Sequence, residues 1–140
     1  MPTHPTDGFT VGFVFSSDVK HVLLQLKQKP PAHRNLYNGI GGRKQPNESW
    51  LTCMSRECFE ETGLSIKSTR WQLLRRDWAI DGSTLFVYLA RYQGLLNDIR
   101  TGDAGLAEWF PCGRLPPNLV PDVRALVSAG RRHFIQYVRA

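Results

Sequence analysis

Three glutamates, Glu57, Glu60 and Glu61, form the clearest chemical pattern in this sequence. Their spacing of i, i+3 and i+4 places all three within one narrow arc of an α-helix. Like charges on one arc repel one another by roughly a few tenths of a kcal/mol per exposed pair, and a hard divalent cation would offset that repulsion. Mg²⁺ takes carboxylate oxygens and leaves positions for water and phosphates, so the pattern favours a magnesium site. The alternative is a solvated helical face that is balanced only by Arg56.

A helix over residues 49–62 is predicted to carry these carboxylates. The segment contains no Gly or Pro, Ser49 suits the N-cap, and Gly63 stands where a glycine ends many helices. By helical angle Cys53 lies near the glutamates, where it is expected to be a small filler beside the metal site. An adjoining apolar stripe is expected to face the core, and it comprises Leu51, Met54 and Cys58.

The other elements are read from β-forming runs, turn residues and helical periodicity. We predict strands at 9–15, 19–26, 71–80 and 84–92, a short strand at 108–110, loops at 28–38 and 94–105, and a final helix at 121–134 with Pro121 in its first turn. Asp81-Gly82-Ser83 indicates a hairpin. Within 84–92, Leu85, Val87 and Leu89 would share one face, and Phe86, Tyr88 and Ala90 the other. This order of elements predicts an α/β fold in which helices pack on a mixed sheet.

The bulk composition is that of a single soluble domain spanning 1–140. No segment has the roughly 18 apolar residues of a membrane span, and the N-terminus does not resemble a secretory signal. The three cysteines are expected to be free thiols in a reducing compartment, with the cytoplasm as the default. A net charge of +6 favours anionic partners. The basic residues are spread along the chain, which fits a small polyanion better than a dedicated nucleic-acid arm.

The wider context of the glutamates resembles the signature of a known family. The chain reads Gly42-x5-Glu48-x7-Arg56-Glu57-Cys58-x-Glu60-Glu61-x-Gly63-Leu64, which is the pattern of the Nudix box. Seven fixed identities, each with a background of about 6%, coincide by chance on the order of once in 10⁹ start positions. Cys58 replaces a usual larger aliphatic residue and Asn47 a frequent glycine, and neither departure affects the carboxylates.

The resemblance implies a Nudix α/β/α sandwich with a mixed central sheet and a Mg²⁺ cofactor, with Mn²⁺ as the alternative ion. It places the metal on Glu57, Glu60 and Glu61 with help from the carbonyl of Gly42. Glu48 would be a further ligand or a supporting partner. Arg56 would orient Glu57, and Arg43 matches a position where relatives often have a Lys that contacts phosphate.

Two glutamates are candidates for the general base that takes a proton from the attacking water. Glu57 is one. Glu108 is the other, because Ala107-Glu108-Trp109 resembles the Gly-Glu-Trp segment of the bacterial MutT protein, whose late glutamate lies at the metal site. A glutamate on a surface strand is also common without any catalytic role.

The resemblance also suggests which residues contact the substrate. Asn38 and Asp122 match positions that read a purine edge in enzymes of the MutT type, although for Asp122 the favoured explanation is a first-turn acid stabilised by the helix dipole. Three basic residues could meet phosphates but are expected to be ordinary solvated charges: Lys27, Lys29 and Arg34. Two aromatic residues could stack on a base, with packing in the core or at the rim as the alternative: Tyr37 and Trp78.

The predicted activity is hydrolysis of a normal or oxidised nucleoside triphosphate to the monophosphate and pyrophosphate. The same chemistry would suit an RNA 5′ end, a dinucleoside polyphosphate or a nucleotide sugar. No membrane partner is expected. A different class of protein, a non-catalytic Nudix module that senses a nucleotide, is disfavoured because every carboxylate of the box is present.

Overall fold

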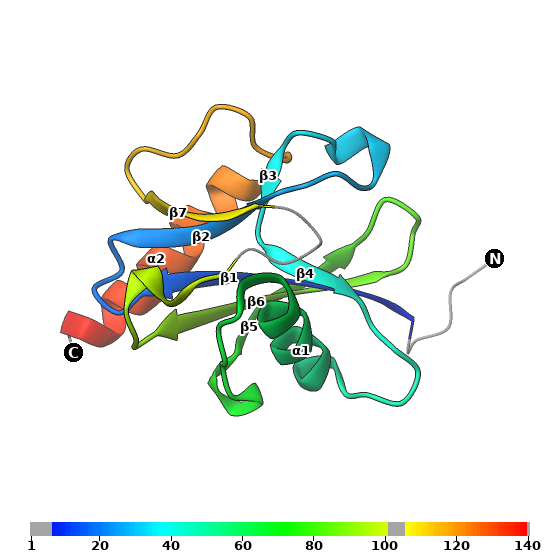
Figure 1. Ribbon diagram of the computed structural model, residues 1–140, viewed down its shortest axis with the longest axis horizontal. Coiled ribbons are helices and arrows are strands. Elements are labelled where there is room, and N and C mark those ends of the chain that lie inside the picture. The colour runs from blue at the N-terminus through cyan, green and yellow to red at the C-terminus, as the bar shows by residue number, and fades with distance from the viewer. Residues whose placement is uncertain (1–6, 101–105, 140) are drawn as a thin grey trace.

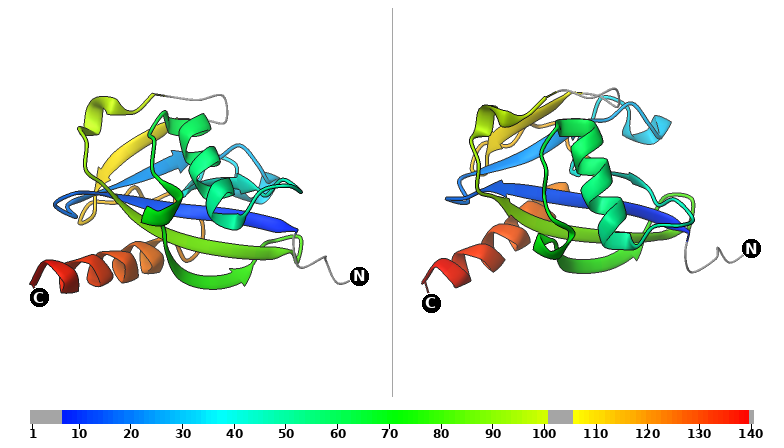
Figure 2. Two further views of the ribbon diagram at one scale, coloured as in Figure 1. Left: turned by 90° about the horizontal axis from the view of Figure 1, so that it is seen from below. Right: turned by 60° about the horizontal axis from the view of Figure 1, so that its bottom comes forward.

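A mixed β-sheet between two helices forms the body of the protein in the computed structural model, which describes residues 7–100 and 106–139. Helix α1 covers one face of the sheet and helix α2 the other (Figures 1 and 2). The strands are β1 Gly8–Ser16, β2 His21–Leu26, β3 Tyr37–Asn38, β4 Ile40–Arg43, β5 Gln72–Trp78, β6 Thr84–Tyr92 and β7 Ala107–Pro111, and the helices are α1 Trp50–Thr62 and α2 Val123–Arg139. Short 3₁₀ turns occupy Pro31–His33, Ser68–Arg70 and Leu96–Asp98.

Strand β1 is the centre of the sheet, whose main order is β3-β2-β1-β6-β5. β1 runs parallel to β6 from the pair Gly8 and Thr84 to the pair Ser16 and Tyr92. The opposite edge of β1 is shared, because its first half pairs with β4 and its second half with β2, both antiparallel. β7 continues the sheet beyond β2. The mixed sheet predicted from the sequence is thereby confirmed.

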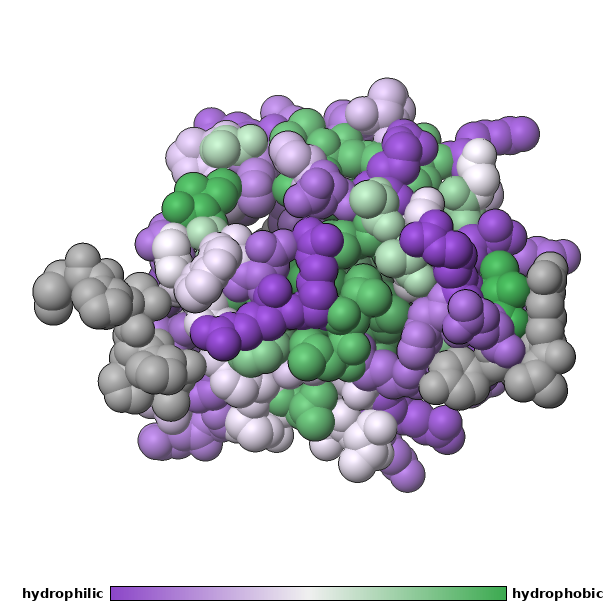
Figure 3. Space-filling view, turned by 180° about the vertical axis from the view of Figure 1, so that it is seen from behind, coloured by the Kyte–Doolittle hydropathy of each residue, from purple (hydrophilic) through white to green (hydrophobic). Residues whose placement is uncertain are grey.

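The sheet separates two hydrophobic clusters. The α2 cluster contains Val11, Phe13, Phe15, Leu24, Val87, Leu89, Val127 and Phe134, and the α1 cluster contains Val14, Leu23, Ile40, Met54, Cys58, Trp71, Tyr88 and Ala90. The alternation predicted for 84–92 is confirmed, since Leu85, Val87 and Leu89 pack in the α2 cluster. Phe86, Tyr88 and Ala90 pack in the α1 cluster. The outer surface on the α2 side mixes hydrophilic and hydrophobic side chains (Figure 3).

Helix α1 begins and ends as the sequence predicts. The Ser49 hydroxyl accepts a hydrogen bond from the Thr52 N–H at 3.1 Å, and Gly63 ends the helix with φ of 76°. Met54 and Cys58 are fully buried. Leu51 packs partly buried against the same cluster. The three cysteines of the chain are free thiols, also as predicted.

Helix α2 differs from its prediction at both ends. It begins at Val123, because Asp122 has a φ of 75° and therefore cannot belong to the first turn; only its carbonyl takes part, accepting the N–H of Leu126. The placement of Pro121 and Asp122 inside the helix was wrong. The helix also continues past residue 134 to Arg139. No helix in the described ranges is both long and apolar enough to cross a membrane.

Two of the predicted loops contain regular structure. The segment 28–38 includes a 3₁₀ turn and the short strand β3, whose Tyr37 forms a bridge with Leu119. The segment 94–105 includes the turn at Leu96–Asp98, and its last five residues lie outside the described ranges, as does the N-terminal segment 1–6. Val19, predicted at the start of a strand, lies in the β1–β2 turn with φ of 61°.

Candidate active site

Two carboxylates of α1 lie directly against the glycine backbone of β4, beside which the helix packs (Figure 1). The Gly41 N–H donates to Oε2 of Glu61 at 3.2 Å. A Cβ atom added at Gly42 would lie only 2.6 Å from the carboxyl carbon of Glu57. Position 42 must therefore be glycine for the Glu57 carboxylate to approach the strand this closely.

Glu57 and Glu61 are neighbouring acids whose side chains have little exposure to water. Glu61 is 6% exposed, and burial raises the pKa of its carboxyl to about 7; Lys27 opposes this shift and Glu57 adds to it. Burial also raises the pKa of Glu57 above its ordinary value, with Arg56 opposing the shift. Two adjacent acids in this state tend to share one proton until a cation joins them.

Arg56 holds the remaining acids of the motif together. Its guanidinium bonds both oxygens of Glu48, with Nη2 to Oε1 at 2.7 Å and Nε to Oε2 at 2.8 Å. Its Nη1 lies 3.1 Å from Glu57 and 3.1 Å from Glu60. These hydrogen bonds from Arg56 hold the pKa of Glu48 at about 2 and raise the pKa of the guanidinium itself. Arg56 thus contacts Glu48, Glu57 and Glu60, and the role predicted for it, to orient Glu57, stays a prediction.

Replacing Arg56 by Lys should weaken both the fold and turnover. A lysine has one compact charge and cannot bond both oxygens of Glu48 while also reaching Glu57. We expect a loss of about 1.5–3 kcal/mol in the free energy of unfolding, measured by urea titration. We also expect about a tenfold or larger loss in kcat, because Glu57 loses its orientation. Unchanged stability and unchanged kcat in the Lys variant would show that the fork of hydrogen bonds has no such role.

The acids of this site suit a hard divalent ion, although they are not gathered as a finished metal cluster. Among the described residues no three His, Cys, Asp or Glu side chains stand in such a group. Glu57 and Glu61 are drawn together at β4, whereas the Glu60 side chain is 55% exposed and bonded to Arg56. An exposed carboxylate gains a charge-assisted hydrogen bond from a guanidinium, whereas a position beside two further acids would add repulsion between like charges. The donors are oxygens, which Mg²⁺ and Mn²⁺ prefer.

Gln25 of β2 and Lys27, which follows the last residue of that strand, lie on the same side of the sheet, and the sequence did not indicate that they lie near the acids of α1. Leu23 belongs to the α1 cluster, so Gln25 and Lys27 follow on the same face. Gln25 is fully buried, and its Oε1 accepts from Nζ of Lys27 at 2.7 Å. Its Nε2 has no hydrogen-bond partner among the described residues.

Lys27 was expected to be a solvated charge, and the structure corrects this. Burial lowers the pKa of its ammonium group, which Glu61 and Glu57 partly oppose by attraction. The alternation of Leu23, Gln25 and Lys27 was visible in the sequence. The sequence did not show that this side of the sheet faces the glutamates of α1, because that depends on the order of the strands.

The residues predicted to contact substrate are engaged within the protein. The Arg43 guanidinium pairs with Asp81 at 3.3 Å and lies over the ring of Phe9. Asn38 lies opposite Gln25, and its Oδ1 accepts the N–H of Gly39 at 2.7 Å.

Asp122 and Glu108 are not brought to the acids of α1. The exposed carboxylate of Asp122 lies 3.5 Å from Arg75 of β5. Glu108 is exposed on β7 and pairs with Leu24, whose side chain belongs to the α2 cluster. Its neighbours Ala107 and Trp109 pack on the α1 side, so strand alternation directs Glu108 away from Glu57.

The two aromatic candidates each contact a neighbouring side chain. Tyr37 packs edge-on against Phe110 with their ring centroids 4.9 Å apart. Trp78 lies at the rim, where it is 65% exposed, and the guanidinium of Arg76 lies over its ring.

A helix that presents paired acids to a glycine strand, inside an α/β/α sandwich, defines the class of fold to which this chain belongs. The sequence profile of the NUDIX domain family matches residues 6–130. The chain therefore belongs to the Nudix family. It is 36% identical over 89 residues to the NAD-capped RNA hydrolase NudC of Vibrio parahaemolyticus, a match that covers 62% of this chain and 34% of that protein. The chain thus spans about a third of the length of this curated relative.

Solved structures share the fold at low sequence identity. The NUDIX domain of Shewanella oneidensis NrtR, complexed with ADP ribose, superposes with a TM-score of 0.73 at 19% identity, covering 90% of this chain and 86% of that one. A MutT/nudix family protein from Enterococcus faecalis gives 0.71 at 18% identity, covering 91% and 61%. These similarities confirm the predicted sandwich.

Proposed function

We propose that this chain is a Mg²⁺-dependent pyrophosphohydrolase that cleaves the diphosphate linkage of a nucleotide. The observation that carries the proposal is the pair of Glu57 and Glu61, which lie together against β4, partly and fully buried respectively, with raised pKa values. Adjacent buried acids destabilise a fold unless something balances them. A divalent ion with a bound diphosphate supplies both the balancing charge and the substrate.

The acids of α1 and Arg56 have different proposed roles in the reaction. Glu57 and Glu61 would hold the metal with the Gly42 carbonyl, and Glu60 would join them from its present contact with Arg56. The bound ion supplies neutralisation of phosphate oxygens and a lowered pKa for water. Arg56 keeps Glu57 in place through its shared bonds to Glu48. Glu57 then takes the proton of the attacking water, a role for which Glu108 remains the alternative.

Lys27 and Gln25 are proposed to bind substrate oxygens. The Lys27 ammonium is held by the carbonyl oxygen of the Gln25 amide, which leaves the amide N–H groups of Gln25 as buried donors without a partner among the described residues. A buried donor without a partner is unfavourable, and a phosphoryl oxygen is a strong acceptor that could bond it. Both side chains lie on the face of the sheet that carries the acids of α1.

Replacing Lys27 by Met tests this assignment. We expect kcat/KM to fall by about tenfold or more, because a charge-assisted contact to phosphate is lost. Lys29→Met is the matched control, since Lys29 is exposed on the same connection, and it should leave kcat/KM unchanged. Equal effects of the two substitutions on kcat/KM would refute a specific role for Lys27.

Two classes of substrate fit this site. A nucleoside triphosphate is the first, and it was suggested by the purine-reading positions Asn38 and Asp122. A dinucleotide diphosphate, free or at an RNA 5′ end, is the second. It gains support from the NAD-capped RNA hydrolases among the relatives and from the engagement of Asp122 with Arg75.

A substrate panel tests the proposal and separates the two classes. The protein is incubated with Mg²⁺ and nucleoside triphosphates, dinucleotide diphosphates, nucleotide sugars, dinucleoside polyphosphates and capped or 5′-triphosphate RNA, and the products are resolved by chromatography. Release of a nucleoside monophosphate that stops with EDTA would support the hydrolase and name the class. Binding of nucleotide without cleavage of any substrate would instead favour the sensing module.

A further inference from the structure

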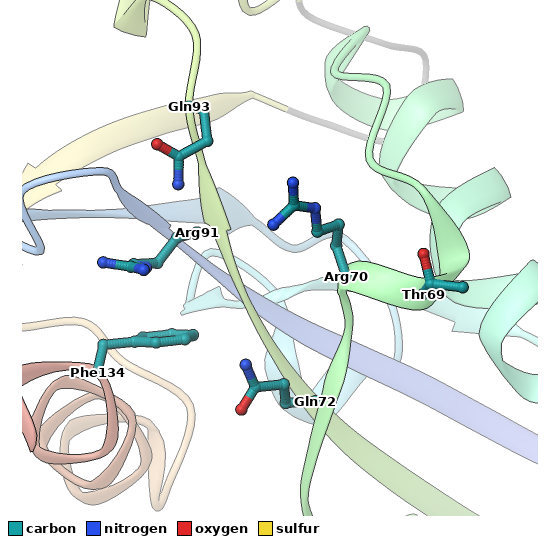
Figure 4. A pocket seen from close by; sticks show the side chains of 6 residues that line it. All are labelled: Thr69, Arg70, Gln72, Arg91, Gln93 and Phe134. Carbon is teal, nitrogen blue, oxygen red and sulfur yellow. The ribbon is translucent and has the colours of Figure 1, made fainter. Parts of the chain in front are cut away.

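A small hollow lies away from the acids of α1, where the start of β5 and the end of β6 meet α2 (Figure 4). Its volume is about 180 Å³, and it is lined by Thr69, Arg70, Gln72, Arg91, Gln93 and Phe134. In the sheet register Arg91 lies beside Phe15, whereas Gly42 lies beside Thr10. These two positions of β1 are five residues apart, or about 16 Å along the strand, so the hollow is separate from the candidate active site.

The hollow carries positive charge that nothing in its lining balances. No carboxylate belongs to the lining, which includes the guanidinium groups of Arg70 and Arg91. Among the described residues, neither guanidinium has a hydrogen bond or an ion pair with an acid. The Arg91 guanidinium lies over the ring of Phe134, 5.4 Å from its centroid, which fixes the position of the charge.

The amides of the hollow also present donors. Oε1 of Gln72 bonds Nε2 of His133 at 2.5 Å. An amide oxygen only accepts, so the histidine nitrogen donates and the Gln72 nitrogen is left facing the hollow. Figure 4 shows this nitrogen and that of Gln93 turned toward the space between the two arginines.

We propose that this hollow is a phosphate-binding site. Two unpaired guanidiniums with converging N–H donors match a phosphate oxyanion, which accepts several charge-assisted hydrogen bonds at once. The phosphate has two sources with the same chemistry: a phosphodiester of an RNA chain attached to the substrate, or inorganic phosphate. The RNA source rests on the proposed function, whereas binding of phosphate itself does not.

The first test measures binding in EDTA, so that neither metal nor turnover enters. Inorganic phosphate and oligoribonucleotides of about 4 to 16 nucleotides are titrated into the full chain by calorimetry. We expect Arg70→Gln and Arg91→Gln each to weaken binding by about tenfold. Arg124→Gln is the matched control, because Arg124 is exposed on α2 outside the lining, and it should bind like wild type.

The second test compares substrates of different length in the same variants. Turnover of a small nucleotide substrate should be unchanged in Arg70→Gln, while KM for an RNA-linked substrate rises by about tenfold if RNA is the source. If both variants lose phosphate binding and the wild type shows no preference for RNA, inorganic phosphate is the ligand of the hollow. Wild-type binding of both ligands in Arg70→Gln and Arg91→Gln would overturn the site. An inactive chain with variant-sensitive binding would refute the hydrolase and leave this site standing.

Discussion

Glu57→Gln is expected to lower kcat by a factor on the order of 10³ or more and to leave the fold intact. Glutamine has nearly the same shape as the glutamate that packs against Gly42, so the packing of α1 on β4 should be preserved. It removes the charge that would hold the metal and the basic oxygen that would take a proton from water. The measurement is single-turnover hydrolysis of the substrate found in the panel, with circular dichroism to confirm the fold.

Glu108→Gln is the comparison that decides between the two candidate bases. Glu108 is exposed on β7, and strand alternation directs it to the side of the sheet away from α1. We therefore expect Glu108→Gln to keep most of its activity. A loss in Glu108→Gln as large as in Glu57→Gln would transfer the base role to Glu108 and show that β7 rearranges when substrate binds.

Glu61→Gln should raise the stability of the metal-free protein while it abolishes turnover. In the wild type, Glu61 is buried beside Glu57, and burial raises its pKa to about 7, so ionising both acids is unfavourable. A glutamine can still accept from the Gly41 N–H and can donate its own N–H to Glu57. We expect a gain on the order of 1–3 kcal/mol in the free energy of unfolding in EDTA.

The difference in stability between Glu61→Gln and the wild type should depend on pH in a defined direction. Between the ordinary value of 4.5 and about 7, folded Glu61 binds more protons than the unfolded chain does, so wild-type stability falls as pH rises through this window. The advantage of Glu61→Gln should be small near pH 4.5 and complete above about pH 7. Saturating Mg²⁺ should reduce it by stabilising only the wild type. A glutamine variant that melts below wild type in EDTA at about pH 8 would contradict the account.

The local parts of the fold could be predicted from the sequence because their causes are local. Ser49 and Gly63 determine where α1 begins and ends, and the alternation in 84–92 determines which of its side chains face each helix. The spacing of Glu57 and Glu61 likewise places both on one side of α1 wherever that helix packs.

The features that could not be predicted depend on contacts between distant segments. The partly buried position of Lys27 near the acids follows from the place of β2 in the sheet, which the alternation of residues within β2 does not reveal. The contact of Glu60 with Arg56 depends on how the guanidinium is placed by its bonds to Glu48, a residue outside α1. Asp122 adopts a left-handed backbone at a position where its sequence also suited a helical turn, and its side chain reaches Arg75 on another strand.

The central sheet keeps the two hydrophobic clusters apart, with β1 contributing Val14 to one and Phe13 and Phe15 to the other. Helix α1 and its acids pack on the α1 cluster, whereas α2 and the hollow at Phe134 pack on the α2 cluster. When two substitutions are distant from one another and share no partners, their effects on the free energy of unfolding are nearly additive. Over evolutionary time, descendants of this chain can therefore change the side chains of the hollow on the α2 side without altering the acids of α1.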